Sequence, residues 1–212
     1  MRILLGWAVA AVLAASGCTA MTSASEQAQA GDDKGYVAGD GSVMEVSAAD
    51  RGDPVVVAGV DTEGEPLSTQ DHRGEVVVLN LWYAACGPCR DEAPDLADIA
   101  REKAAQGVQF IGIDTRDDPA TAASFERTFD LPYPSIIDQQ GDAVLALRGV
   151  ATPNAVPTTI VLDRDGRVSA RISGRVDPST LTTLIDTALG ENSSAAGASG
   201  EPAEVGSQSG QG

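Results

Sequence analysis

Two cysteines separated by two residues are the clearest candidates for chemistry in this chain. A C-G-P-C segment at residues 86–89 follows a nearly continuous apolar run, Val76–Trp82, and precedes a polar helical pattern that opens at Arg90. The apolar run is typical of a central strand buried on both faces. The start of a helix presents unpaired N–H groups and partial positive charge, which favour a thiolate on the first cysteine. The pattern therefore predicts a redox dithiol in which Cys86 attacks a disulfide and Cys89 closes a ring with it.

The residues around this pair resemble the TlpA/ResA-like branch of the thioredoxin superfamily, a group of extracytoplasmic thiol-disulfide oxidoreductases. Trp82 begins the superfamily pattern W-x-x-x-C-G-P-C, and Glu92 and Pro94 complete the C-x-x-C-x-x-E-x-P of the branch. The resemblance covers roughly residues 53–189. It implies an α/β, thioredoxin-like fold, with a central mixed β-sheet flanked by helices and an added N-terminal β-hairpin.

The resemblance also implies roles for residues outside the dithiol. Glu92, three residues after the second cysteine, would approach the thiols and tune their ionisation; an exposed charge at the start of the helix is the alternative. Pro157 is similar to the superfamily's cis-proline, which faces the dithiol. The backbone of Val156 before it would then pair with an extended substrate. Trp82 and Tyr83 would pack beside the disulfide as a rim that contacts the substrate.

Asn80 lies in the apolar run at the place where thioredoxin itself has an acid. The structural alternative is a polar side chain that bridges backbone groups. The presence of an amide here argues against a buried acid in the strand and moves the expected acid role to Glu92.

Other uses of a cysteine pair fit the sequence poorly. A zinc site requires two further Cys or His ligands, and His72 is the only histidine of the chain. A peroxiredoxin would carry Thr three residues before its attacking cysteine, where this chain has Tyr83. A copper-delivering relative typically has wider cysteine spacing and a distal histidine. We therefore expect neither a metal nor another cofactor.

The first 17 residues have the pattern of a bacterial export signal. Arg2 precedes a short apolar run, residues 3–15, which is too short for a comfortable transmembrane helix. The small residues before Cys18 resemble a lipobox, in which the cysteine is lipidated and becomes the new N-terminus; cleavage near Ala20 and an uncleaved anchor are the alternatives. Lipidation would account for the third cysteine, which is otherwise an odd thiol in an exported chain. We expect an extracytoplasmic lipoprotein anchored to the cell membrane.

Composition divides the rest of the chain. Residues 18–52 are rich in Ala, Ser, Gly, Gln and Asp and are predicted to form a flexible tether, with 43–49 as a weak candidate strand. Residues 53–190 carry the thioredoxin-like domain, with the element order β-β-β-α-β-α-β-α-β-β-α, and 191–212 are predicted to be disordered. The net charge of −17 argues against nucleic-acid binding, which requires a basic surface.

The leading hypothesis is a protein disulfide reductase that acts on the thiols and disulfides of exported proteins. The resemblance suggests apocytochrome c as one substrate and a membrane electron donor such as a CcdA/DsbD-like protein. The Gly-Pro dipeptide between the cysteines matches that of reducing thioredoxins, so we expect a potential below roughly −200 mV. Two alternatives stay open: a disulfide oxidase for newly exported proteins, and a non-catalytic redox-sensing lipoprotein.

Overall fold

The structure is a computed structural model that describes residues 42–151 and 155–197, with side chains as far as residue 191. The expected signal peptide, the expected lipidation site Cys18 and most of the expected tether and tail lie outside these residues. No helix of the described part is both long enough and apolar enough to cross a membrane.

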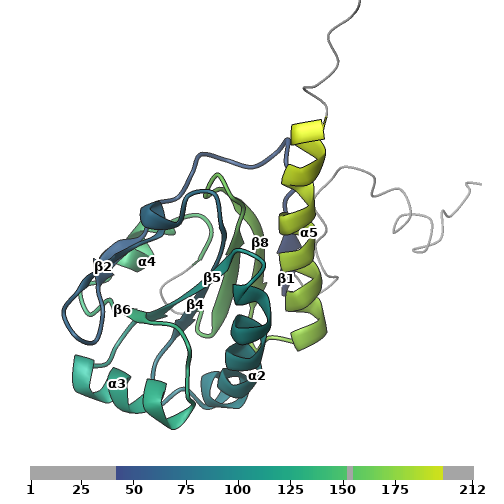
Figure 1. The fold of residues 1–212 in the computed structure, drawn as a ribbon. Coiled ribbons are helices and arrows are strands. Elements are labelled where there is room, and N and C mark those ends of the chain that lie inside the picture. Colours follow the sequence, from purple (N-terminus) through teal and green to yellow (C-terminus); the bar gives the residue numbers. More distant parts are fainter. Residues whose placement is uncertain (1–41, 152–154, 198–212) are drawn as a thin grey trace, which may run out of the picture. The chain divides into compact units, whose positions relative to one another are not determined.

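A six-stranded mixed sheet forms the centre of the fold, in the order β1-β8-β7-β4-β5-β6 (Figure 1). Its central strand β4, Val76–Trp82, is buried at all seven positions, as the apolar run predicts. It is parallel to β5, Val108–Asp114, and antiparallel to β7, Thr158–Leu162. Strand β6, Ser135–Ile137, extends the parallel side, and β8, Val168–Ser173, extends the antiparallel side.

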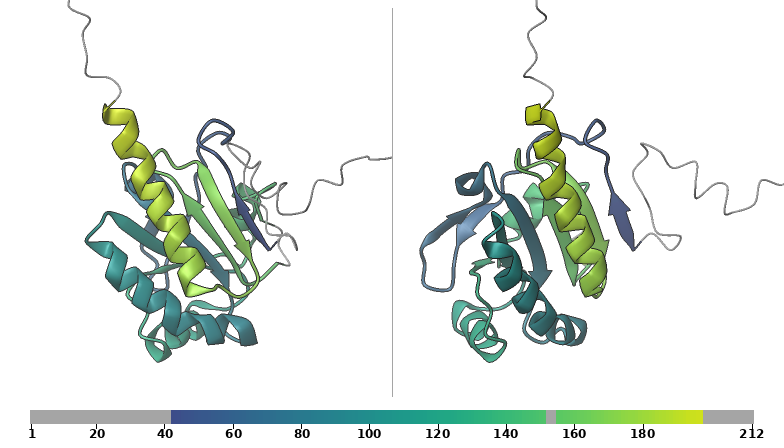
Figure 2. Two further views of the ribbon diagram at one scale, coloured as in Figure 1. Left: turned by 90° about the vertical axis from the view of Figure 1, so that its right-hand side faces the viewer. Right: turned by 45° about the vertical axis from the view of Figure 1, so that its right-hand side comes forward.

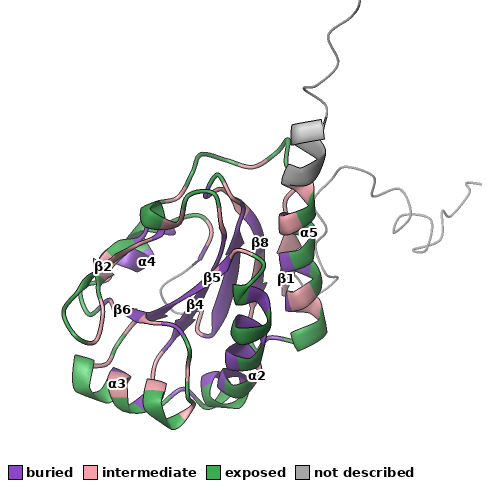
Figure 3. Cartoon of the chain, viewed as in Figure 1, coloured by how far each residue is buried: buried purple, intermediate pink, exposed green. Residues whose placement is uncertain are grey.

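The side chains of β4 alternate between two hydrophobic cores because successive residues of a strand face opposite sides of the sheet. Val76 packs in the core that contains helices α2, Gly87–Ala104, and α5, Pro178–Gly197. Val77 packs in the opposite core, which contains helix α4, Asp142–Ala146. Figure 2 shows α2 and α5 side by side on one face, and Figure 3 shows the buried sheet between the two layers. The predicted thioredoxin-like fold is confirmed.

The predicted N-terminal hairpin is a separate two-stranded sheet made of β2, Ala58–Val60, and β3, Pro66–Ser68. The first strand of this hairpin begins only at Ala58. Upstream of it, the backbone N–H of Val55 donates to the carbonyl of Gly166 at 2.8 Å and does not join the hairpin. A short 3-10 helix, η1 (Thr69–His72), connects the hairpin to β4.

Both ends of the domain reach beyond the predicted boundaries at residues 53 and 190. Strand β1, Val43–Glu45, pairs with β8, so the sheet begins within the segment predicted as a tether. The Arg51 guanidinium, with 2% of its side chain exposed, bridges Asp163 at 3.1 Å and Glu191 at 2.6 Å. Helix α5 continues to Gly197. The sequence placed these boundaries too far inward because the contacts that define them join distant segments.

Candidate active site

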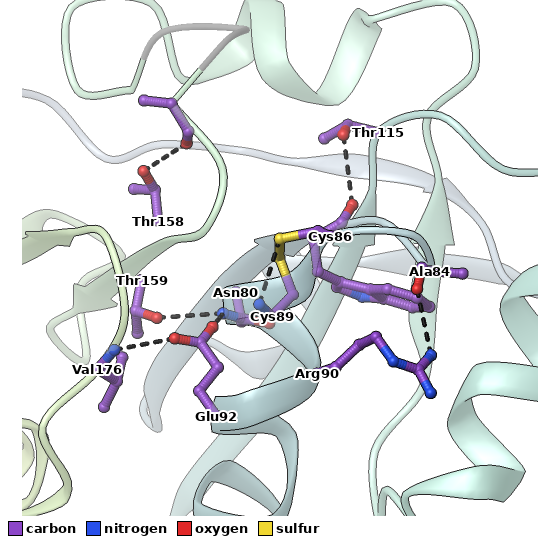
Figure 4. The surroundings of a disulfide bond; sticks show 12 residues. Asn80, Ala84, Cys86, Cys89, Arg90, Glu92, Thr115, Thr158, Thr159 and Val176 are labelled. Atoms are coloured by element: carbon purple, nitrogen blue, oxygen red, sulfur yellow. Dashed lines mark hydrogen bonds between the residues drawn. A yellow bond between two sulfur atoms is a disulfide. The ribbon is translucent and has the colours of Figure 1, made fainter.

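The two cysteines form a disulfide at the start of helix α2, with an S–S distance of 2.02 Å (Figure 4). Cys86 is the N-cap residue, and its Sγ accepts a hydrogen bond from the backbone N–H of Cys89 at 3.2 Å. The sulfur therefore lies where the helix presents its unpaired N–H groups. Both residues are buried, with 3% and 2% of their surface exposed, so exposure does not distinguish them in this oxidised state.

Glu92 is fully buried, so the alternative of an exposed charge on the helix surface is wrong. Its Oε1 accepts from Nδ2 of Asn80 at 2.9 Å, and its Oε2 accepts from the backbone N–H of Val176 at 2.9 Å. Burial raises the pKa of Glu92 to about 6, although both hydrogen bonds and the charge of Arg175 oppose the shift. Within the described residues, neither carboxyl oxygen is hydrogen-bonded to a cysteine. The carboxyl group can thus exchange a proton in the neutral pH range.

Asn80 anchors this acid to the sheet. Its Nδ2 donates to Glu92 and also to Oγ1 of Thr159 at 3.2 Å, directly across the register of β4 and β7 (Figure 4). The amide therefore bridges two side chains, and the alternative in which it bridges backbone groups is wrong. Together with Val176 in the segment before α5, it ties helix α2 to three other parts of the fold.

The two aromatic residues expected at the rim differ in exposure. Trp82 is 1% exposed and packs in one cluster with both cysteines; its ring stacks on Phe125 with centroids 4.1 Å apart, and its Nε1 donates to Ser135 Oγ at 3.3 Å. Trp82 thus packs beside the disulfide as expected but is buried in this oxidised state, and its contact with substrate stays a prediction. Tyr83 is half-buried, and the guanidinium of Arg116 lies 4.1 Å from the centre of its ring.

The segment before β7 has the backbone expected from the sequence. The peptide bond between Val156 and Pro157 is cis. The Val156 side chain is half-buried and packs against the cluster around the disulfide. The carbonyl of Pro157 accepts from the N–H of Gly174 at 2.9 Å. In the described part of the chain, no hydrogen bond involves the N–H or the carbonyl of Val156, so both groups are open to a partner.

His72 lies in η1, where its Nδ1 is 3.1 Å from Oε2 of Glu75. It takes no part in the surroundings of the disulfide. Across residues 42–151 and 155–197, no group of three or more His, Cys, Asp and Glu side chains is arranged to hold a metal ion.

Sequence reasoning missed the acidic loop that follows β5. Asp114, the last residue of β5, is fully buried, and its Oδ1 accepts from the backbone N–H groups of Arg116 at 2.9 Å and Asp117 at 2.8 Å. The carboxylate of Asp117 accepts from the N–H of Ala84, two residues before Cys86. Several acids follow β5, and β5 is parallel to β4. Because parallel strands end at the same edge of a sheet, this pattern could have predicted that the acidic loop lies beside the dithiol.

The fold and this dithiol together define a thioredoxin-like protein. A model of the Redoxin family matches residues 40–185, and the chain belongs to this family. Among solved structures, it is similar to a secreted thiol-disulfide isomerase from Corynebacterium glutamicum, with 31% identity, a TM-score of 0.67, and coverage of 73% of this chain and 96% of that one. A DsbF homologue from Corynebacterium diphtheriae is 28% identical, with a TM-score of 0.63 and coverage of 72% and 96%.

Two curated relatives are named for thiol-disulfide chemistry. The thiol-disulfide oxidoreductase ResA of Bacillus thuringiensis subsp. konkukian is 31% identical over 114 residues, which are 54% of this chain and 64% of that protein. The thiol:disulfide interchange protein HelX of Rhodobacter capsulatus is 31% identical over 125 residues, which are 58% of this chain and 67% of that protein. The chain thus spans less than two thirds of the length of the ResA relative and 67% of the length of HelX.

Proposed function

We propose that this chain is an extracytoplasmic thiol-disulfide oxidoreductase that works as a protein disulfide reductase. The observation that carries the proposal is the Cys86–Cys89 disulfide at the start of α2, with the sulfur of Cys86 at the N-cap. A thiolate at that position is stabilised by the helix N–H groups and is the species that attacks disulfides. The names of the ResA and HelX relatives support the same chemistry.

The reaction uses the two thiols in turn. The Cys86 thiolate attacks one sulfur of a substrate disulfide, a mixed disulfide forms, and the other substrate sulfur leaves as a thiolate that takes up a proton. The Cys89 thiolate then attacks the sulfur of Cys86, which releases the reduced substrate and leaves the Cys86–Cys89 disulfide. The substrate has gained two electrons, and a dithiol donor must return two electrons to this chain before the next cycle.

Glu92 is the group to which we assign the proton of Cys89. It lies one turn further along the same face of α2, and its pKa of about 6 allows it to gain and lose a proton near neutral pH. An ionised carboxyl group near the dithiol also disfavours a second negative charge on sulfur. This effect raises the free energy of the thiolate form and favours electron donation, in agreement with the reducing direction.

The substrate is proposed to be an exported protein with a disulfide in an extended segment. The open N–H and carbonyl of Val156 would pair with its backbone, and Tyr83 would contact it beside the dithiol. Apocytochrome c is the substrate that the sequence resemblance suggests, and a CcdA/DsbD-like membrane protein is the corresponding donor. Lipidation of Cys18 would hold the chain at the membrane, close to such a donor.

Two measurements on the full chain without its signal peptide test the reaction. A Cys89→Ser variant is expected to accumulate mixed disulfides with exported proteins through Cys86, whereas Cys86→Ser accumulates few; equal trapping contradicts the order of attack. A redox titration in glutathione buffers is expected to give a potential below roughly −200 mV. A value near −120 mV, typical of the oxidant DsbA, would favour the disulfide oxidase over the reductase. If the Cys86–Cys89 pair exchanged with no substrate disulfide, only the redox-sensing function would remain.

Membrane anchoring is tested separately in cells. Cys18→Ala is expected to abolish labelling by a fatty-acid analogue and to release the protein from the membrane fraction. Retention of an unlabelled native protein in that fraction would rule out the lipid anchor.

A further inference from the structure

The loop after β5 holds the turn that leads into the dithiol. Three consecutive residues of this loop, 115–117, contact three consecutive residues at the end of β4 and just beyond it, 82–84. The backbone N–H of Thr115 donates to the carbonyl of Trp82 at 3.0 Å. The guanidinium of Arg116 lies 4.1 Å from the centre of the Tyr83 ring. The carboxylate of Asp117 accepts from the N–H of Ala84 at 2.5 Å.

The third contact reaches closest to the dithiol. Oδ2 of Asp117 accepts the backbone N–H of Ala84, and the N–H of Cys86 donates to the carbonyl of Tyr83 at 3.0 Å. Ala84 therefore lies inside the turn that the backbone of Cys86 closes. A hydrogen bond from an N–H to a carboxylate is roughly twice as strong as one between neutral groups. Fixing Ala84 in this way fixes the turn that delivers Cys86 to the start of α2.

Asp114 determines where the Asp117 side chain points. It is fully buried, and its Oδ1 accepts the N–H groups of Arg116 and Asp117, which closes the loop on itself. Burial raises the pKa of Asp114 to about 6, the backbone hydrogen bonds oppose the shift, and the charge of Asp117 adds to it. With Asp114 engaged by the loop backbone, Asp117 is the acid whose side chain accepts from the N–H of Ala84.

We propose that Asp117 is a positioning residue for the dithiol, because it holds the turn that places the sulfur of Cys86 at the N-terminus of α2. The proposal rests on the proposed function in that Cys86 is the attacking thiol. Without the contact, the turn is less fixed, and the sulfur of the reduced protein spends less time next to the helix N–H groups. The Cys86 thiolate is then less stabilised and forms less readily at neutral pH.

Two variants of the same residue separate position from charge. Asp117→Asn and Asp117→Ala both remove the negative charge, but only asparagine keeps an oxygen that can accept from Ala84. We expect the reduced Asp117→Ala protein to be alkylated by iodoacetamide at Cys86 about fivefold more slowly at pH 7 than Asp117→Asn. This ratio corresponds to the loss of one hydrogen bond. The pH profile should show a higher pKa of the Cys86 thiol in the alanine variant, with both proteins alkylated at the same limiting rate at high pH.

The neighbouring Asp118 supplies a matched control. It caps α3, Pro119–Thr128, by accepting from the N–H groups of Ala120 and Thr121 at 3.0 Å, and among the described residues none of its hydrogen bonds reaches Ala84. Asp118→Ala is expected to lower the melting temperature and to leave the alkylation profile of Cys86 unchanged. If Asp117→Ala folds poorly, Asp117→Ser takes its place in the comparison. The serine hydroxyl is too short to replace the carboxylate, so we expect the same slower alkylation of Cys86.

Two results would overturn the proposal: identical alkylation profiles for Asp117→Asn and Asp117→Ala, or an equal shift in Asp118→Ala. Alkylation needs no protein substrate and no electron donor. A chain that reduces no disulfide would therefore refute the proposed function while leaving this test valid. Conversely, an active reductase with identical profiles would refute the positioning role alone.

Discussion

Replacement of Glu92 by Gln tests whether the buried carboxyl group costs stability when it ionises. The pKa of Glu92 is raised from its ordinary value of 4.5 to about 6, chiefly by burial. The folded protein therefore binds this proton more tightly than the unfolded chain does. The protonated Glu92 side chain makes a favourable contribution to the free energy of unfolding, which is fully present below pH 4.5 and is lost as the pH rises through 6. The shift corresponds to about 2 kcal/mol of unfolding free energy.

Glutamine keeps the size of the side chain but has no charge to lose. It can accept from the N–H of Val176 and, if the Asn80 amide turns over, donate to the oxygen of that amide. Any cost of this rearrangement is independent of pH. We therefore expect the difference in unfolding free energy, variant minus wild type, to rise by about 2 kcal/mol between pH 4 and pH 8. Urea denaturation of the oxidised protein at several pH values measures this difference, provided that the m-values agree.

Glu102→Gln is the matched control, since it removes the same charge from an exposed position of the same helix. Its stability profile should run parallel to that of the wild type from pH 4 to pH 8. Asp114 and Glu126, whose pKa values are also raised by burial, are present in all three proteins and cancel in the comparison. If the Glu92→Gln and wild-type profiles were also parallel, the account of a buried acid that ionises at a cost would be refuted.

Three further substitutions test the packing around the site. Gly112→Ala would place a Cβ 2.2 Å from Ser135 Oγ, and we expect a loss of about 1–3 kcal/mol in urea denaturation from overpacking. Asn80→Asp would put a second carboxyl group against Glu92, so the protein should lose stability more at pH 8 than at pH 5; a loss independent of pH would contradict this. Arg51→Met should cost about 2–3 kcal/mol, and an unchanged denaturation midpoint would show that its ion pairs contribute nothing.

The sequence predicted the elements of the fold because their signals are local. The apolar run Val76–Trp82 became strand β4 with the same bounds. Strand β1 was only a weak candidate, since three half-buried residues in a polar segment acquire a partner only when β8 lies beside them.

The contacts around the dithiol were less predictable because they join residues far apart in the chain. Glu92 was expected near the thiols from the family resemblance, but its bond to the N–H of Val176 joins residues separated by 84 positions. The partner of Asp117, Ala84, offers only a backbone N–H, which every residue except proline carries. No residue type in the sequence marks such a partner, and only the folded chain identifies it.

The acids near the dithiol share a feature that bears on the direction of electron flow. Glu92 accepts hydrogen bonds from an amide and a backbone N–H, and Asp117 from a backbone N–H, so the hydrogen-bond donors of both carboxyl groups are neutral. A neutral donor satisfies a carboxylate without cancelling its charge, and that charge acts against a thiolate nearby. Strong oxidants of the DsbA type depend on a stabilised thiolate in the reduced form. The helix start favours the Cys86 thiolate here while the acids limit its stability, and this is the balance that the proposed reductase requires.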